Sequence, residues 1–308
     1  MVDDWGQAKL PAPDTTLEGA YCRLRPLELE RDVPVLFAET HGDATKAAVW
    51  TYMKYGPWET AEAMQAHYAL LKPATQLMLI VESKQSGKIV GSISYMTMEP
   101  NDRSIELGSI FYFASAQRTE ANTEAAYLLA RHAIEVLGYR RVEWKANALN
   151  AKSRKSAARM GFVYEGILRS KCITKGNNRD TIYFSMLEDE WYASRKANYE
   201  KWLYQNATPR ISLAELNGNL YAGPEPVTAA AAAAFQPTRA GAVSYVSPNG
   251  LTVLGAAATM TASPLPSGSP STPASAGDAS DSSAVLARLR ALEQELTALK
   301  QKVLGGQA

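Results

Sequence analysis

The 308-residue sequence has few of the residues that build disulfide frameworks or metal centres. Its two cysteines, Cys22 and Cys172, lie far apart and outside any CxxC spacing, which predicts two buried structural thiols and neither a disulfide framework nor a zinc site. Its three histidines, His41, His67 and His132, form no HxxH or HExxH pair. The sequence therefore predicts no metal site.

The sequence also lacks an excess of one charge and a long apolar run. With 32 basic and 31 acidic residues, its formal net charge is +1, so it has no general attraction to a polyanion and we expect no nucleic-acid partner. The cations Arg169, Lys171, Lys175 and Arg179 are interpreted as a solvated hairpin. No stretch reaches the ~18 apolar residues of a membrane span, and the N-terminus has no secretory pattern. We expect no membrane partner and a cytoplasmic location.

Composition divides the chain into parts. Every tryptophan lies at or before Trp202, whereas the last hundred residues are mostly Ala, Ser, Pro, Gly and Thr. Such a composition cannot bury enough apolar area to offset the cost of ordering, which predicts disorder. The predicted parts are an N-terminal arm (1–15), one globular domain (16–205), a low-complexity disordered linker (206–281) and a short coiled-coil helix (282–304).

The final segment has apolar residues in alternating steps of four and three. This is the seam of a two-stranded coiled coil, and its flanking charges attract one another in a parallel homodimer. The alternative is a solitary amphipathic helix that docks on its own domain, since three heptads make a marginal helix. The seam residues are Val285, Leu289, Leu292, Leu296, Leu299 and Val303.

The segment from 16 to 205 reads as strands and helices in a defined order. Apolar periodicity changes from alternation to steps of three and four along it, which indicates an α+β fold in which three consecutive strands form an antiparallel meander. Strands are expected at 20–25, 77–81, 88–98, 104–113, 141–148, 162–174 and 181–187, and helices at 28–40, 58–71, 119–137, 151–160 and 188–204.

Two junctions could carry chemistry. In the first, a strand runs through the loop after Phe113 into a long helix, whose free N–H groups and positive dipole end can hold a phosphate. An ordinary strand–helix connection is the alternative. In the second, Asn150 to Arg154 lead into a short helix that Gly161 ends, and these residues could simply cap that helix.

Taken in order, three short motifs resemble one family. They are NTEA at Asn122–Ala125, NAKS at Asn150–Ser153 and GFVYEG at Gly161–Gly166. Together they resemble the GNAT acyltransferases, in particular the RimJ/RimL-like branch, over about Thr16 to Trp202. The resemblance implies a mixed, mostly antiparallel sheet that splays between its fourth and fifth strands, with coenzyme A in the gap.

The resemblance also implies a coenzyme site. The family's pyrophosphate loop falls on Gln117 to Asn122, where Glu120 and Asn122 stand in place of small residues. Glycine permits close approach of backbone to phosphate, so we expect the backbone amides to bind acetyl-CoA, the acyl donor, with Glu120 turned outward. The implied coenzyme-binding residues are Ile110, Phe111, Tyr112, Phe113, Gln117, Arg118, Thr119, Glu120, Ala121, Asn122, Thr123, Asn150 and Ser153.

The implied reaction is direct transfer of an acetyl group to an amine, without a covalent enzyme intermediate. A carboxylate is the natural general base for an ammonium group. Glu106 matches an acidic position of the branch, with a cross-strand ion pair as its alternative role, and Glu165 is a weaker candidate. Ser153 matches the acid that protonates the departing thiolate, and Tyr164 is the other candidate for that acid.

The sequence therefore predicts an acetyl-CoA-dependent N-acetyltransferase that acts on a primary amine, either a protein N-terminus or a small molecule. The alternative is a catalytically weak GNAT-fold module that binds coenzyme A or oligomerises. Four aromatic residues, Trp50, Tyr52, Tyr55 and Trp58, suggest an aromatic wall for the acceptor, although aromatics at this density are more often core.

Overall fold

A computed structural model describes residues 6–117, 119–205 and 211–225, all within one compact unit of residues 1–236. The predictions for the linker after 225, for the coiled coil at 282–304 and for the homodimer through it lie outside these described residues. So does Arg118. No helix in the described part is long and apolar enough to cross a bilayer.

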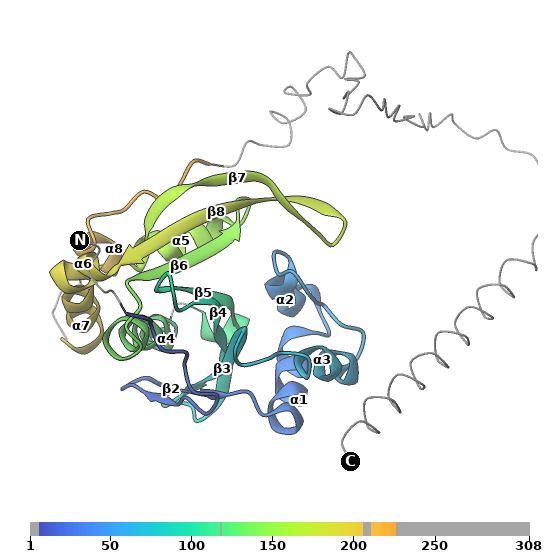
Figure 1. Cartoon of the computed structure of the whole chain (residues 1–308). Helices are drawn as coiled ribbons and strands as arrows, with labels where there is room; N and C mark the ends of the chain where they lie inside the picture. Colours follow the sequence, from blue (N-terminus) through green and yellow to red (C-terminus); the bar gives the residue numbers. More distant parts are fainter. Residues whose placement is uncertain (1–5, 118, 206–210, 226–308) are drawn as a thin grey trace, which may run out of the picture. The chain divides into compact units, whose positions relative to one another are not determined.

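The fold is built on one eight-stranded sheet with the order β1-β2-β3-β4-β5-β6-β8-β7 (Figure 1). All neighbouring strands are antiparallel except β5 and β6, which are parallel. The expected mixed, mostly antiparallel sheet is confirmed. The strands are β1 (Leu17–Glu18), β2 (Cys22–Pro26), β3 (Gln76–Ser83), β4 (Ile89–Glu99), β5 (Ser104–Tyr112), β6 (Arg141–Asn147), β7 (Val163–Thr174) and β8 (Asn177–Leu187).

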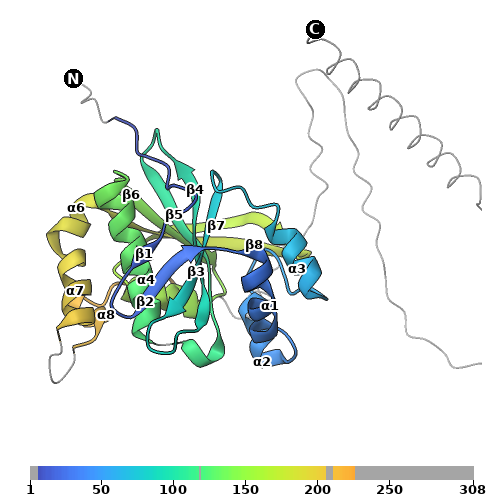
Figure 2. The ribbon, with the colours of Figure 1, turned by 90° about the horizontal axis from the view of Figure 1, so that it is seen from below.

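Helices cover both faces of this sheet. Figures 1 and 2 show α1, α2 and α3 together on one side and α4, α7 and α8 on the other. The helical elements are α1 (Leu29–Thr40), α2 (Ala44–Ala47), η1 (Ala48–Trp50), α3 (Ala61–Tyr68), η2 (Ala114–Ala116), α4 (Glu120–Arg131), η3 (His132–Val136), α5 (Ala151–Arg159), α6 (Glu188–Glu190), η4 (Trp191–Arg195), α7 (Lys196–Tyr204) and α8 (Leu213–Leu216).

Strand alternation divides the buried residues into two cores. Ile105 and Leu107 of β5 point into the larger core, which contains the apolar face of α4. Phe111, beyond a bulge in the same strand, belongs to the smaller core with α1, η1 and α3. Successive side chains of a strand point to opposite faces, so the even-numbered Glu106 lies on the face of the smaller core.

Two predicted elements differ from those observed by three or more residues at one or both ends. The helix expected at 58–71 is α3, which begins after its cap Thr60, whose hydroxyl accepts a hydrogen bond from the Ala63 N–H. The strand expected from Thr181 begins at Asn177. A two-residue turn, Lys175 and Gly176 with φ of 51° and 74°, has the type I′ geometry that closes tight hairpins.

Residues 211–225, here called the C-terminal strap, belong to the folded domain. Leu213 is fully buried, and Ser212 caps α8 through the N–H of Glu215. Asn198 of α7 donates to the carbonyl of Leu216 at 2.8 Å. The boundary predicted at 205 is therefore too early, because a single buried leucine in a polar stretch leaves little trace in apolar periodicity.

The glutamate of the NTEA motif is a structural anion. Glu124 of α4 is fully buried, and its carboxylate accepts hydrogen bonds from the backbone N–H groups of Ala20, Tyr21 and Cys22 at 2.7–2.8 Å. Tyr204 of α7 donates a fourth at 2.8 Å. One side chain thus fixes the turn between β1 and β2 against α4 and α7.

Candidate active site

The site centres on a gap in the sheet between β5 and β6. Their parallel ladder has only three pairs and ends where Glu106 is opposite Glu143. Past this point β5 has a bulge at Ser109, whose φ is 49°, and β6 pairs only with β8. The backbone of β5 beyond Glu106, including the predicted coenzyme residues from Ile110, is therefore open toward β6. When the two-residue β1 is not counted, β5 and β6 are the fourth and fifth strands, between which the family resemblance implies that the sheet splays.

The junction after β5 presents an uncapped helix end. No side chain caps the first turn of α4, because the hydroxyl of its N-cap residue Thr119 donates instead to the carbonyl of Ala116 at 3.0 Å. Gln117 is turned back and donates to the carbonyl of Tyr112 at 3.3 Å. The first turn of α4 thus has no side-chain cap, and the amides of such a turn can bind an anion.

The second motif brings Ser153 to the end of β6. Asn150 caps α5, and its side-chain oxygen accepts from the Ser153 N–H at 3.1 Å, so the capping role is present. Trp144 Nε1 donates to Ser153 Oγ at 2.9 Å. A hydroxyl has one donor and two acceptor positions. Trp144 uses an acceptor position and leaves the Ser153 proton available for donation.

Glu106 is held by one of its two oxygens. It is 8% exposed, and Oε2 accepts from Thr97 Oγ1 at 2.9 Å and from Lys145 Nζ at 3.1 Å. Within the described chain, no hydrogen bond reaches Oε1. A Cβ at Gly108 would lie 3.1 Å from Oε1 and 2.6 Å from Met96 Sδ, so glycine leaves room for this carboxylate. The ion pair expected as the alternative role of Glu106 is therefore present, with Lys145, and it does not involve Oε1.

Lys145 links the candidate base to a row of charges on the same face. Its ammonium group also lies 2.7 Å from Glu143, which is 2.8 Å from Arg141. Burial opposes the charge on Lys145, but attraction to Glu106 and Glu143 outweighs it and raises the pKa of the ammonium group. Lys145 therefore remains a cation beside Glu106.

The structure does not bring the other two predicted catalytic residues to the gap. Both oxygens of Glu165 accept from Arg141, at 2.7 and 2.5 Å, and this guanidinium holds the pKa of Glu165 below its usual value. Tyr164 lies on β7, which β8 separates from β6, and its ring packs edge-on against Tyr221 of the strap at 5.3 Å.

The aromatic residues on the opposite side are mainly core. Trp50 is fully buried, with ring centroids 5.0 Å from both Trp58 and Phe111. Burial raises the pKa of Tyr55, whose hydroxyl lies toward Ser109 in the bulge of β5. Within this cluster, Phe111 lies on β5, the strand that borders the gap.

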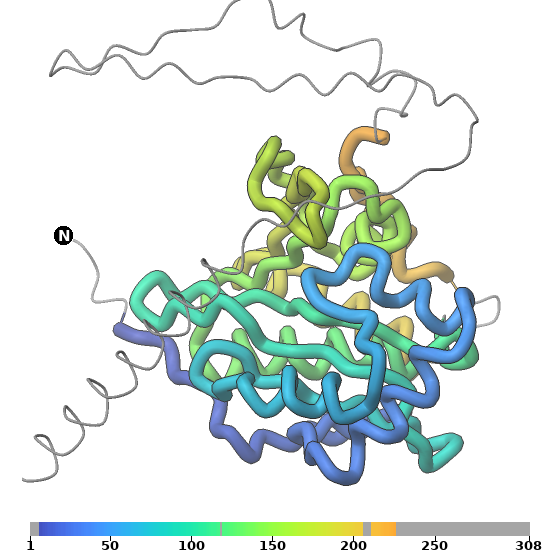
Figure 3. Tube along the Cα trace, turned by 90° about the vertical axis from the view of Figure 1, so that its right-hand side faces the viewer, coloured from blue at the N-terminus to red at the C-terminus, as the bar shows by residue number. Residues whose placement is uncertain are grey.

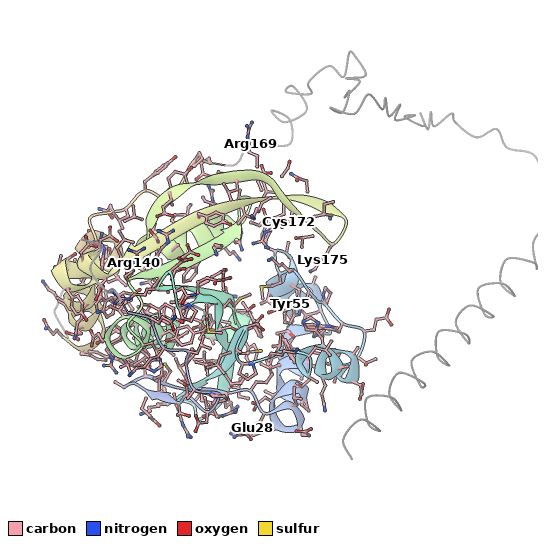
Figure 4. The ribbon with its side chains drawn as sticks, in the orientation of Figure 1. Glu28, Tyr55, Arg140, Arg169, Cys172 and Lys175 are labelled. Carbon is pink, nitrogen blue, oxygen red and sulfur yellow. The ribbon has the colours of Figure 1, made fainter. Side chains whose placement is uncertain are left out.

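The β7–β8 hairpin bridges to this cluster. It projects from the sheet (Figure 3), and Lys175 Nζ at its tip donates to the carbonyl of Trp50 at 2.7 Å. Figure 4 shows Cys172 and Lys175 on the side of the hairpin toward Tyr55, and Arg169 on the other side. Cys172 is half-buried rather than buried as predicted.

Sequence reasoning missed two residues on the face of Glu106. Lys145 alternates with the buried Trp144 and Ala146 along β6, so its face could have been assigned from the pattern. Arg179 was grouped with the solvated cations, yet it is buried. No three His, Cys, Asp or Glu side chains within the described ranges are placed to hold a metal ion.

Comparisons with known proteins agree with this geometry. Residues 22–163 match the family described as "Acetyltransferase (GNAT) domain". The chain is 32% identical over 108 residues to YdaF of Bacillus subtilis (strain 168), whose name proposes ribosomal N-acetyltransferase activity, and this match covers 34% of the chain and 57% of YdaF.

Two solved structures match over all or nearly all of their length. A GCN5-related N-acetyltransferase from Brucella melitensis is 32% identical, with a TM-score of 0.65, covering 70% of this chain and 100% of the other. A probable acetyltransferase of the GNAT family from Chromobacterium violaceum is 35% identical, with a TM-score of 0.58, covering 62% and 95%.

Proposed function

Since this chain belongs to the GNAT acetyltransferase family, we propose that it transfers the acetyl group of acetyl-CoA directly to a primary amine. The acceptor is a protein N-terminus or a small molecule. The observation that carries the proposal is the placement of Glu106 and Ser153 at opposite faces of the same gap. Glu106 lies on the face of the smaller core, whereas Ser153 bonds to Trp144 in the larger core.

The coenzyme side of the gap is formed by α4 and α5. The uncapped amides at the start of α4 hold the pyrophosphate, because they supply donors and the positive end of the helix dipole. The open backbone of β5 from Ile110 pairs with the pantetheine amides, and the thioester then lies near Ser153. Glu120 is the first residue of α4, so its carboxylate must point away from the phosphate.

Glu106 and Ser153 carry out the two proton transfers of the reaction. Glu106 Oε1 accepts a proton from the acceptor ammonium, directly or through one water, and the neutral amine attacks the thioester carbonyl. A tetrahedral adduct forms and its carbon–sulfur bond breaks. Ser153 donates its proton to the departing thiolate and is reprotonated, through water, by the proton that the attacking nitrogen loses as the amide forms. Glu106 releases its proton to solvent, and the products are the acetylated amine and coenzyme A.

Calorimetric titration with acetyl-CoA and assays of coenzyme A release from an amine panel test this proposal. We expect Glu106→Gln to lower kcat about 100-fold or more while the Kd of acetyl-CoA stays unchanged. Glu165→Gln is the matched control, because that carboxylate is committed to Arg141. Full activity in Glu106→Gln would exclude it as the base.

The alternative function is a module that binds coenzyme A without turnover. Glu120 at the phosphate turn is the observation that favours it. Binding of acetyl-CoA without coenzyme A release from any amine would support this alternative over the enzyme. Self-association through residues 282–304 is a separate proposal, tested by light scattering of the full chain against residues 1–225.

A further inference from the structure

Arg179 differs from every other buried charged residue in the described chain. It is 7% exposed, and its Nε is buried without a hydrogen-bond partner. Among the described residues, no ion pair or hydrogen bond reaches the side chain of Arg179. The other buried charged side chains all have partners, and they are Arg25, Asp32, Glu106, Glu124 and Arg154.

Burying an unpaired guanidinium opposes folding strongly, because the charge loses its hydration and gains no partner. Arg154 shows how this chain normally handles such a group. Arg154 lies under the C-terminal strap, where the carbonyl of Pro224 and the carboxylate of Glu225 accept from it. Arg179 is buried as well, but no carboxylate or carbonyl of the described residues accepts from its side chain. This indicates that a ligand supplies the missing anion.

The register of β8 places Arg179 on the face of Glu106. Ile182 and Phe184 point into the larger core, so the odd-numbered residues of the strand point to the opposite face. Tyr183 is among them, and its ring lies 5.4 Å from Lys145 Nζ. Arg179 is also opposite Cys172 across the hairpin, and Figure 4 shows Cys172 on the side toward Tyr55.

This face is separate from the coenzyme side, which α4 and α5 form. An anion that reaches Arg179 therefore belongs to the acceptor and not to coenzyme A. A guanidinium presents parallel N–H donors that match a carboxylate. Lys175 on the same hairpin adds a second cation, which disfavours polyamines.

We propose that Arg179 binds a carboxylate of the acceptor, so that the substrate is an amine that also carries a carboxylate, such as an amino acid or an acidic peptide. This inference rests on the proposed function and assigns its substrate class. Glu106 receives the proton of the amine, and Arg179 holds the other end of the same molecule.

The test compares matched acceptors with the wild-type chain and with Arg179→Met. The acceptors are amino acids against their amides, and amidated peptides with glutamate against glutamine at one position. We expect the wild type to favour a carboxylate form. In Arg179→Met, the KM of the carboxylate acceptor should rise about 10- to 100-fold, as expected for the loss of one charge-assisted hydrogen bond. The KM values of the matching amide acceptor and of acetyl-CoA should not change. Arg169→Met, an exposed cation on the other side of the hairpin, is the control.

Stability separates this role from a structural one. Removing an unpaired buried charge should leave the unfolding midpoint of the ligand-free chain unchanged or higher. A midpoint lowered by several degrees, or an equal loss on carboxylate and amide acceptors, would overturn the assignment to Arg179. Preference for the amides in the wild type would do the same. If the wild type acetylates no amine at all, the proposed function itself fails.

Discussion

Lys145 Nζ lies 3.1 Å from Oε2 of Glu106, just past the last pair of the parallel ladder between β5 and β6. This contact, with the bond from Thr97, fixes Oε2 of the carboxylate and leaves Oε1 without a hydrogen bond in the described chain. A general base needs such a fixed orientation, because small displacements of a catalytic group lower the rate steeply.

Replacing Lys145 by Met should therefore lower kcat on the order of tenfold to a hundredfold, because Glu106 loses an anchor and faces Glu143 without the intervening cation. Steady-state kinetics over a range of amine concentrations measures this. The Kd of acetyl-CoA should not change. Lys171→Met, which removes an exposed cation of β7, is the control. Unchanged kcat in Lys145→Met would show that the pair does not orient the base.

Glu124→Gln should destabilise the fold by about 3 kcal/mol, because an amide carries no charge and turns an NH2 group toward backbone donors. Tyr204→Phe removes only one of the four donors to that carboxylate and should lower the free energy of unfolding by about 1 kcal/mol. Urea denaturation of both variants measures the two values. Equal effects of the two substitutions would contradict the central role of the carboxylate.

Shortening the chain tests the C-terminal strap. A chain that ends at 210 exposes the site of Leu213, whose burial alone contributes about 2 kcal/mol, and removes both partners of Arg154. A chain that ends at 225 keeps these contacts. Urea denaturation should find the 1–210 chain less stable than the 1–225 chain, and calorimetry should find weaker acetyl-CoA binding, because Arg154 belongs to α5. Equal stability of the two chains would mean that the strap is dispensable.

Acidification should destabilise the chain below about pH 6.5. Burial lowers the pKa of His41, His67 and His132 from the ordinary value of 6.5. The unfolded chain therefore binds protons first as the pH falls, and the free energy of unfolding declines between 6.5 and the folded-state values.

His41 offers a specific check of this pH effect, because its Nε2 accepts the Trp58 N–H at 3.1 Å and must be neutral to do so. His41→Gln should reduce the difference in the free energy of unfolding between pH 8 and pH 5.5. Urea titrations at both values measure it. An unchanged difference would assign the pH dependence to other groups.

Much of the fold could be predicted from periodicity. Alternation located β4 and β5, and steps of three and four located α4, because each element buries one regular face. The beginning of β8 was missed, since Asn177 and its neighbours have turn-like side chains. They are strand residues only because β7 lies beside them.

The site was predictable in part. Motifs predict Glu106 and Ser153 as candidates; Glu106 lies in the last pair of the β5–β6 ladder, and Ser153 bonds to Trp144 of β6. Their partners Lys145 and Trp144 depend on which strands are neighbours and in what register, which a single sequence does not state. The burial of Arg179 depends in the same way on the packing of a hairpin whose residues look solvated.

The short ladder between β5 and β6 has a mechanical consequence. Only three residue pairs join the half-sheet β1–β5 to the half-sheet β6–β8–β7 directly, and beyond them the inner edges of both halves carry unpaired N–H and C=O groups. A bound acyl donor that pairs with these edges would join the halves like an additional strand. Slower amide hydrogen exchange on both edges at once would then accompany binding, and the substrate would be a structural part of the sheet for the duration of each turnover.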